Sequence, residues 1–260
     1  MKGRIDKIFF YQDGNTPDID PVKIKNDLTK YGFDTCIEGS LFSNLDSNSV
    51  EKYAEMFAKS RVLNINSNTL NDTPLYGEIK YEKNRIITSS SSTGILYDAL
   101  ELSYIYYDLI KKELLKKNFL HIIFTNRLFG TWEDSDLRYH ARVSLYSAVS
   151  IISSAGLIEA PARSRGYYFL KFQLGDIDDY SNMIENGFEK KWLDYGDKRI
   201  NDALLNYVFQ AIFYQIFGEP FCSNKNCCLY NAHWQEEIIN ILENKEPRFC
   251  SKHNLFKKVK

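Results

Sequence analysis

The first part of the chain alternates between short apolar runs and segments with helical spacing. KIFFYQ (7–12) predicts a first strand, and GFDTCI (32–37) and VLNI (62–65) predict two more. Between them, residues 21–30, which begin with a proline, and residues 47–60 have apolar positions spaced for helices. Strands that alternate with helices in this order predict a mixed or parallel sheet with helices packed against it.

The elements become longer after residue 80. KYEKNRIITSSSSTG (80–94) predicts a strand that runs into a serine-rich turn. Apolar residues at helical spacing predict one long helix over 95–117, followed by a strand over 119–126. VSIISSAGL (149–157) predicts another buried strand, and a second long helix is expected over 200–217, before a Gly-Glu-Pro sequence that cannot continue it.

These elements predict an α+β protein in which helices pack on a mixed β-sheet. The 260 residues are enough to bury a full core. Neither repeats nor a long linker divide the chain. We expect a single domain over 1–260, with a mixed-sheet part over 1–200 and a helix followed by a C-terminal segment over 201–260.

The composition of the chain indicates which binding partners and which cellular compartment to expect. Lys+Arg 33 against Asp+Glu 34 is balanced, so neither nucleic acid nor a membrane surface is expected as a partner. The N-terminus, MKGRIDKIFFYQDG, lacks the apolar region and the cleavage site of a secretory signal. The least charged stretch, VSLYSAVSIISSAGLIEA, contains several serines and predicts buried strands rather than a membrane helix. We therefore expect a cytoplasmic protein.

The cysteines are concentrated near the C-terminus, where three of the five lie between residues 222 and 228. In a reducing compartment, clustered cysteines favour a metal over disulfides. Cys222-x4-Cys227 and Cys250-x2-His253 are two short-spaced pairs, which together supply the four donors that zinc prefers in a tetrahedron. The sequence therefore predicts one structural zinc ion with Cys222, Cys227, Cys250 and His253 as ligands.

Spacing leaves two of these ligands open. Cys228 could replace Cys227, and His233 could replace His253. Free cysteines are also among the most buried residues, so plain core packing is the competing interpretation. The polar residues between Cys222 and Cys227 argue against a core strand there.

The C-terminal motifs resemble those of the archaemetzincins, which carry HExxHxxGxxHC-x4-C-x-M and then FC-x2-C. GEPFCSNKNCCL (218–229) matches this pattern from its glycine onward, and FCSKH (249–253) matches FC-x2-C with a histidine for the last cysteine. The order of elements is similar over most of residues 80–253, with 149–157 in the place of the edge strand over the peptidase cleft. The resemblance implies a zincin-like fold in which a structural-zinc segment follows a long helix of the active-site type.

The catalytic half of the family motif is absent. Counting back from Gly218, the positions of the three histidines and the glutamate hold Ala211, Ile212, Gln215 and Phe221. An HExxH helix needs two imidazoles for one zinc ion and a carboxylate as general base, and none of these four side chains can serve. The resemblance therefore implies a peptidase-like protein, inactive as an enzyme, that binds a polypeptide or another partner in the former cleft without cleaving it.

Two other functions remain open from the sequence. His140, His233 and the carboxylate of Glu159 could meet in the cleft and hold a relocated metal ion, which would make the protein an active metallohydrolase. A zinc-stabilised nucleic-acid-binding module is the third function, and the balanced charge disfavours it.

Overall fold

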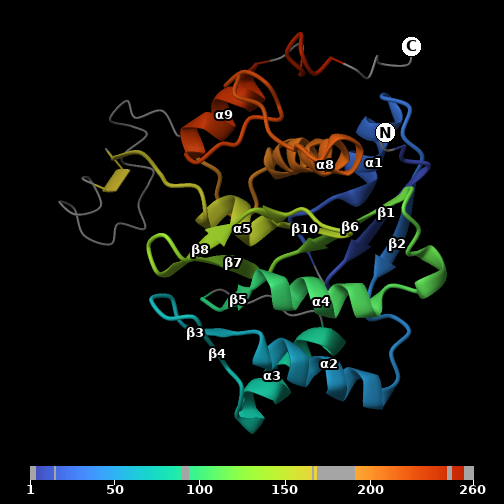
Figure 1. The fold of residues 1–260 in the computed structure, drawn as a ribbon, viewed down its shortest axis with the longest axis vertical. Coiled ribbons are helices and arrows are strands. Elements are labelled where there is room, and N and C mark those ends of the chain that lie inside the picture. Colours follow the sequence, from blue (N-terminus) through green and yellow to red (C-terminus); the bar gives the residue numbers. More distant parts are fainter. Residues whose placement is uncertain are drawn as a thin grey trace.

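The computed structural model of the protein describes residues 4–14, 16–88, 94–165, 167–168, 191–244 and 248–254. Its centre is a five-stranded sheet with the order β2-β1-β6-β10-β9 (Figure 1). The strands are β1 (Lys7–Gln12), β2 (Thr35–Ser40), β6 (Phe119–Thr125), β9 (Ser144–Leu145) and β10 (Val149–Ser153). All but β9 run parallel, and β9 pairs antiparallel with β10 at one edge. The predicted mixed sheet is confirmed.

Helices cover both faces of this sheet (Figure 1). One face carries α1 (Pro21–Thr29), α8 (Ile200–Phe217) and α9 (Gln235–Glu243), and the short α5 (Ser154–Glu159) directly follows β10. The other face carries α2 (Ser47–Lys59) and α4 (Ala99–Leu109), and α3 (Tyr76–Thr88) packs beside α2. A 3-10 turn (Lys112–Leu114) precedes β6.

Two smaller sheets complete the described fold. One contains β5 (Leu96–Asp98), β7 (Leu128–Glu133) and β8 (Arg138–Arg142), and the other pairs β3 (Val62–Asn64) with β4 (Thr69–Leu70). Among the described helices, none has both the length and the apolar character that crossing a membrane requires.

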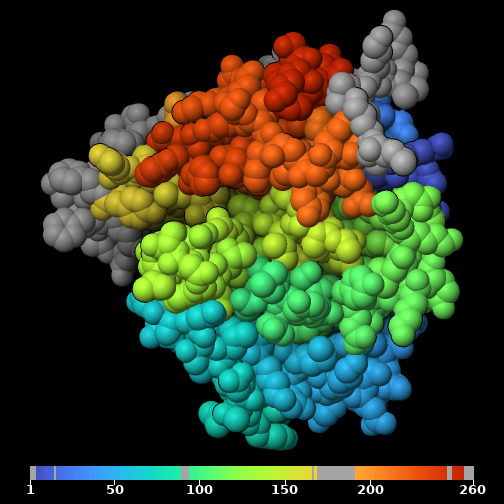
Figure 2. Space-filling model, in the orientation of Figure 1, coloured from blue at the N-terminus to red at the C-terminus, as the bar shows by residue number. Residues whose placement is uncertain are grey.

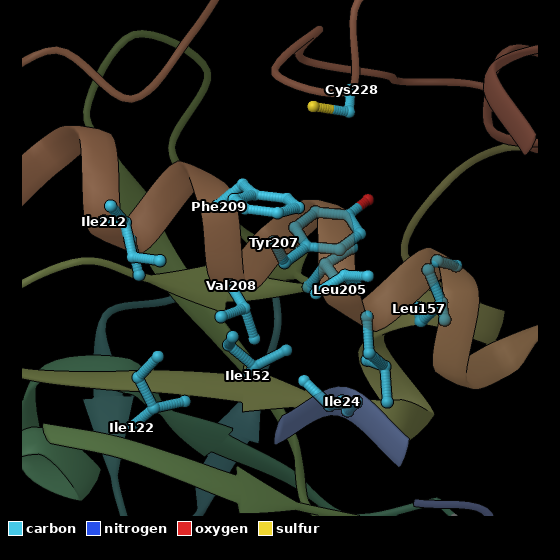
Figure 3. Close-up of a cluster of buried hydrophobic side chains, with 14 of the residues drawn as sticks. Ile24, Ile122, Ile152, Leu157, Leu205, Tyr207, Val208, Phe209, Ile212 and Cys228 are labelled. Atoms are coloured by element: carbon cyan, nitrogen blue, oxygen red, sulfur yellow. The ribbon is translucent and has the colours of Figure 1, made fainter. Parts of the chain in front are cut away.

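The core follows the two-residue period of the strands. Ile8 and Phe10 of β1 face α8, whereas Phe9 and Tyr11 face α2 and α4. Because the central strands are covered on both faces, they appear in the sequence as nearly continuous apolar runs. Figure 3 shows Ile122 and Ile152 of the sheet beneath Val208 and Ile212 of α8. α8 is therefore the main helix of one core.

Several predicted elements lie where the pattern placed them. β1 and α8 match their predicted ranges, and α1, α2 and β6 end within one residue of theirs. β2 begins at Thr35 instead of residue 32, because Gly32 adopts a φ of 82° in the turn before it.

The strand predicted over 80–94 was wrong, because α3 covers most of that range as a helix. Its buried residues are Glu82, Arg85 and Ile86, at helical spacing, and two of the three are charged. A hydrophobic pattern cannot mark a helix whose buried side chains are ions. The serine-rich residues that follow α3 lie outside the described part of the chain.

The single helix predicted over 95–117 was also wrong, since β5, α4 and the 3-10 turn share that range. Asp98 ends the strand and caps the helix, because its carboxylate accepts hydrogen bonds from the backbone N–H groups of Leu100 and Glu101, both at 2.9 Å. Because β5 and α4 pack against the same core, their apolar residues form one continuous pattern in the sequence, which resembles that of a single helix.

The strand predicted over 149–157 is β10 followed by α5. The Ser153 hydroxyl accepts a hydrogen bond from the backbone N–H of Gly156 and starts the helix. Residues 154–158 are all buried, so no polar face marks them as helical. β10 lies between β6 and β9, so the edge position implied for 149–157 belongs to β9.

A cluster of buried charges lies where β1 and β6 end. Arg127, just after β6, donates from Nε to Asp13 at 2.9 Å and from Nη1 to Glu82 at 2.6 Å. Arg61 also donates to Glu82, and the Tyr106 hydroxyl donates to Asp13. Charges are tolerated inside a protein only when paired and hydrogen-bonded, so this cluster fixes α3 against the two strand ends.

Candidate functional site

The cysteine-rich loop begins where α8 ends. Gly218 ends the helix with a φ of 75°, a left-handed conformation that glycine adopts without strain. The backbone N–H of Cys222 donates to the carbonyl of Leu229 at 2.9 Å, which closes the loop. The N–H of Cys228 donates to the carbonyl of Arg248 at 2.9 Å and so holds the C-terminal segment against the loop.

Four donor side chains from the two segments converge. The Sγ atoms of Cys222 and Cys250 are 3.8 Å apart. Nδ1 of His253 lies 3.2 Å from Sγ of Cys250 and 3.9 Å from Sγ of Cys227. All four donor atoms lie within 4.8 Å of one another, and three of the four residues are buried. Within the described ranges, these residues form the one group of three or more His, Cys, Asp and Glu close enough to share an ion. We call it the Cys3His cluster.

The Cys3His cluster fits a zinc ion. Zinc bound about 2.3 Å from sulfur and about 2.0 Å from nitrogen in a tetrahedron separates two sulfurs by roughly 3.8 Å, and sulfur from nitrogen by roughly 3.6 Å. The separations in the structure lie close to these values. Four protein donors complete a tetrahedron, which is the arrangement of closed structural sites rather than catalytic ones.

The thiols of the cluster differ in their pKa values. A hydrogen bond from the Cys228 thiol, with others from the backbone N–H groups of Cys250 and Leu229, lowers the pKa of Cys227 to about 4, against the effect of burial. Burial raises the pKa of Cys222 to about 11. Zinc binds thiolates, so a metal ion would displace the thiol protons, more readily at Cys227, whose pKa is lowered, than at Cys222, whose pKa is raised.

The two alternative ligands lie outside the cluster. Cys228 is buried in the apolar core over α8, where Figure 3 shows it, and acts as a hydrogen-bond donor to its neighbour. His233 is exposed, and its backbone N–H donates to Glu237 at 3.0 Å. The structure thus places Cys227 and His253 in the cluster.

α8 carries no histidine, and the positions that correspond to the archaemetzincin motif hold other contacts. Ala211 and Ile212 are fully buried in the core. Gln215 donates from Nε2 to the carbonyl of Lys117 at 2.9 Å. Phe221 is 38% exposed. None of these side chains offers an imidazole or a carboxylate to an ion.

A cavity of about 120 Å³ lies between α8, residues 141–144, the end of α5 and residues 231–233. We call it the α8 cavity. Tyr207 and Phe221 contribute to its wall. Next to it, Gln210 accepts a hydrogen bond from the Tyr146 hydroxyl at 2.5 Å and donates to the carbonyl of Tyr230 at 3.1 Å.

The sequence analysis did not single out the α8 residues near this cavity. Tyr207, Gln210 and Tyr214 are spaced three and four residues apart, so they share one face of the helix. The rings of Tyr146 and Tyr214 are 6.1 Å apart. Two tyrosines and a glutamine in line on one face of a largely apolar helix were the signal in the sequence.

The three candidate ligands of a relocated metal site are not brought together. Nε2 of His140 on β8 lies 2.7 Å from the carboxylate of Asp136. Glu159, exposed at the end of α5, accepts a hydrogen bond from the Tyr195 hydroxyl. His233 lines the α8 cavity, and neither His140 nor Glu159 does. Within the described residues these three side chains form no group that could hold one ion.

A family model matches residues 4–259, which is nearly the whole chain, and its description is "Probable metallopeptidase family (DUF6775)". The chain belongs to this family. A solved structure to which the chain is similar is that of a zinc-dependent peptidase from Methanocorpusculum labreanum, at 13% sequence identity and a TM-score of 0.41, over 94% of this chain and 96% of that one. No curated protein matches the chain.

This member of the family described as probable metallopeptidases combines two features. It has a cluster of four converged metal-ligating side chains. Its longest described helix, α8, offers no imidazole to a second ion.

Proposed function

We propose that this protein is a zinc-stabilised, catalytically silent relative of the archaemetzincins that binds a polypeptide beside α8 without hydrolysing it. The observation that carries the proposal is the contrast between the Cys3His cluster, whose donor atoms lie within 4.8 Å of one another, and α8, which carries no histidine. The zincin-like fold, the cytoplasmic location and the absence of nucleic-acid partners are parts of the same proposal.

The proposed role of the zinc ion is structural. Bound to Cys222, Cys227, Cys250 and His253, it would link the loop after α8 to the C-terminal segment. Four protein ligands leave no position for the water molecule that a zinc peptidase must activate. Resemblance to the archaemetzincin cysteine motif supports this role, because the matching cysteines of that family hold its structural ion.

Metal content and hydrolysis together test the proposal. The purified protein is expected to contain one zinc ion per chain by inductively coupled plasma mass spectrometry and to leave a mixed peptide substrate uncut. Cys222→Ser is expected to lose the ion because three donors bind zinc far more weakly than four. Cys36→Ser is the matched control, since Cys36 lies on β2, outside the cluster, and its Sγ donates to Glu38.

An active enzyme would give a different pattern. A second metal ion that is lost with His140→Ala or His233→Ala, together with peptide hydrolysis that the same variants abolish, would overturn the proposal and establish a rebuilt catalytic site. A protein free of metal after purification from zinc-supplemented cells would contradict the structural ion.

A further inference from the structure

The α8 cavity is lined by groups that suit an anion. Arg142 and His233 contribute to its wall, and Ser144 and Asn231 add hydrogen-bond donors. The described residues that line the cavity include no aspartate and no glutamate. A ligand group with negative charge would therefore meet donors and a cation, without a carboxylate to repel it.

The positive charge of Arg142 is only weakly compensated. Its Nε donates to the Thr131 hydroxyl at 2.8 Å, a neutral partner. Nη2 lies 3.8 Å from the carboxylate of Glu133, and both side chains are well exposed. An exposed pair at this distance contributes little free energy, so the guanidinium remains available to a ligand.

Tyr207 adds an unpartnered hydroxyl to the same cavity. The residue is only 9% exposed, and its ring lies in the core. Figure 3 shows the hydroxyl oxygen directed away from Ile122 and Ile152 of the sheet. Burial raises the pKa of Tyr207, so the hydroxyl stays protonated as a donor. No described residue accepts a hydrogen bond from it. The oxygen itself is not fully enclosed, because the buried unpartnered side-chain atoms of the described residues are those of Thr35 and Arg127. The hydroxyl can therefore donate to a ligand oxygen in the cavity.

The size of the cavity limits the ligand to the end of a molecule. Its volume of about 120 Å³ is well below the roughly 300–1,000 Å³ of pockets that enclose a whole small molecule. The ring of Phe221 forms an apolar part of the wall, against which one side chain of the ligand can pack. Figure 2 shows the yellow-green residues near 140–148 and the orange-to-red C-terminal residues next to one another on one face of the molecule.

We propose that the α8 cavity binds the C-terminal carboxylate of a polypeptide, with the Tyr207 hydroxyl donating to one carboxylate oxygen and Arg142 supplying the opposite charge. The inference rests on the proposed function, because it names the part of the polypeptide that is recognised. Recognition of a chain end is consistent with a protein that binds a peptide and does not need to position an internal bond for cleavage.

An array of synthetic hexapeptides attached by their N-termini tests this inference on the full-length, zinc-loaded protein. Each sequence is displayed twice, once with a free C-terminal carboxylate and once as the C-terminal amide. Peptides that bind as acids are expected to bind at least tenfold more weakly as amides. Tyr207→Phe is expected to weaken binding of the acids roughly tenfold, the effect of losing a hydrogen bond to a charged acceptor.

Controls separate the possible failures. Tyr104→Phe removes a hydroxyl from an exposed residue of α4 and is expected to leave binding unchanged. Equal binding of acids and amides would overturn the carboxylate site and leave polypeptide binding intact, whereas no binding of any peptide would overturn both. Full competition by N-acetylated single amino acids would show that a small carboxylate, rather than a chain end, is the ligand. Retained binding by Tyr207→Phe would also contradict the inference.

Discussion

Arg127 is the largest side chain among the fully buried described residues, and it is an ion. Its guanidinium lies 3.9 Å from the ring centroid of Phe57 and pairs with Asp13 and Glu82. Nη2 has no hydrogen-bond partner among the described residues. An unpaired charge at this depth would cost several kcal/mol of desolvation free energy. Arg127 therefore depends on Asp13 and Glu82, and each carboxylate depends on Arg127.

The two buried carboxylates make the stability depend on pH. Burial alone would raise the pKa of Asp13 and of Glu82, but Arg127 and the surrounding hydrogen bonds lower both pKa values below normal. Groups with depressed pKa values stabilise the folded state above their unfolded values, near 4, and lose that effect as the pH falls through the folded values. We therefore expect the free energy of unfolding from urea titrations to fall as the pH drops below about 4.

Asp13→Asn identifies the source of that dependence. The variant is expected to be less stable than the wild type by about 3 kcal/mol at pH 7, because Arg127 loses one of its two counter-charges and keeps Glu82. Between pH 6 and pH 3 its free energy of unfolding should change less than that of the wild type. Asp72→Asn, at an exposed position, is the control and should keep the wild-type slope. Identical slopes for all three proteins would show that Asp13 does not carry the effect.

At the scale of elements, the approach of α5 to β8 depends on Gly156. A Cβ atom at this position would lie 2.2 Å from the carbonyl oxygen of Arg142, whose neighbours line the α8 cavity. Real side chains do not approach a backbone atom so closely, so α5 would have to move. The position of α5 against the residues of the cavity therefore requires a glycine.

Two glycine substitutions should have opposite effects. Gly156→Ala is expected to destabilise the protein by about 1–3 kcal/mol through the clash with Arg142. Gly77→Ala, in α3 with no atom within 4 Å of the added Cβ, is expected to stabilise it by about 0.5–1 kcal/mol because alanine favours a helix. Thermal unfolding of both variants checks the pair. A Gly156→Ala protein as stable as the wild type would mean that α5 adjusts without cost.

The sequence predicted those elements whose buried side chains are apolar. β1 is a nearly continuous apolar run covered on both faces, α2 has one apolar and one polar face, and α8 was recognised by its length and by the Gly-Glu-Pro sequence after it. Two elements without this pattern were predicted wrongly. The buried side chains of α3 include charged ones, and α5 is buried on every side, so neither shows the apolar spacing of a helix. Residue spacing identified the four residues of the Cys3His cluster. It could not distinguish Cys227 from Cys228, because the side chains of adjacent residues point in different directions and only the fold decides which one faces the cluster.

At the scale of the whole molecule, the cysteines of the Cys3His cluster pack in one of two separate cores. One core lies between the sheet and α8, and the other between the sheet and the helices α2 and α4. The C-terminal segment joins the first core through Phe249, whose ring is 4.8 Å from Phe209, and through His253, which is 5.5 Å from Phe213. The cluster therefore stabilises the helical layer on the α8 side of the sheet. The packing of the sheet against α2 and α4 does not depend on it.

Removal of the proposed zinc ion should lower stability without abolishing the fold. A ligand at about a thousand times its dissociation constant contributes roughly 4 kcal/mol, and 1 kcal/mol corresponds to about 2–4 °C for a protein of this size. We expect a strong chelator to lower the Tm by about 10 °C while the far-ultraviolet circular dichroism at 20 °C is retained. The Cys222→Ser variant should show no further decrease. An unchanged Tm in the wild type would argue that the cluster holds no ion.

The interior position of β1 in the sheet, between β2 and β6, has a consequence for synthesis on the ribosome. β1 pairs with β2 on one side and with β6 on the other, and β6 begins at Phe119. A nascent chain that has emerged only through α4 can form the first pairing, yet the second edge of β1 remains open until many more residues are translated. An open apolar strand edge is a site of aggregation, so we expect a nascent chain of this length to aggregate more readily than one that already includes β6.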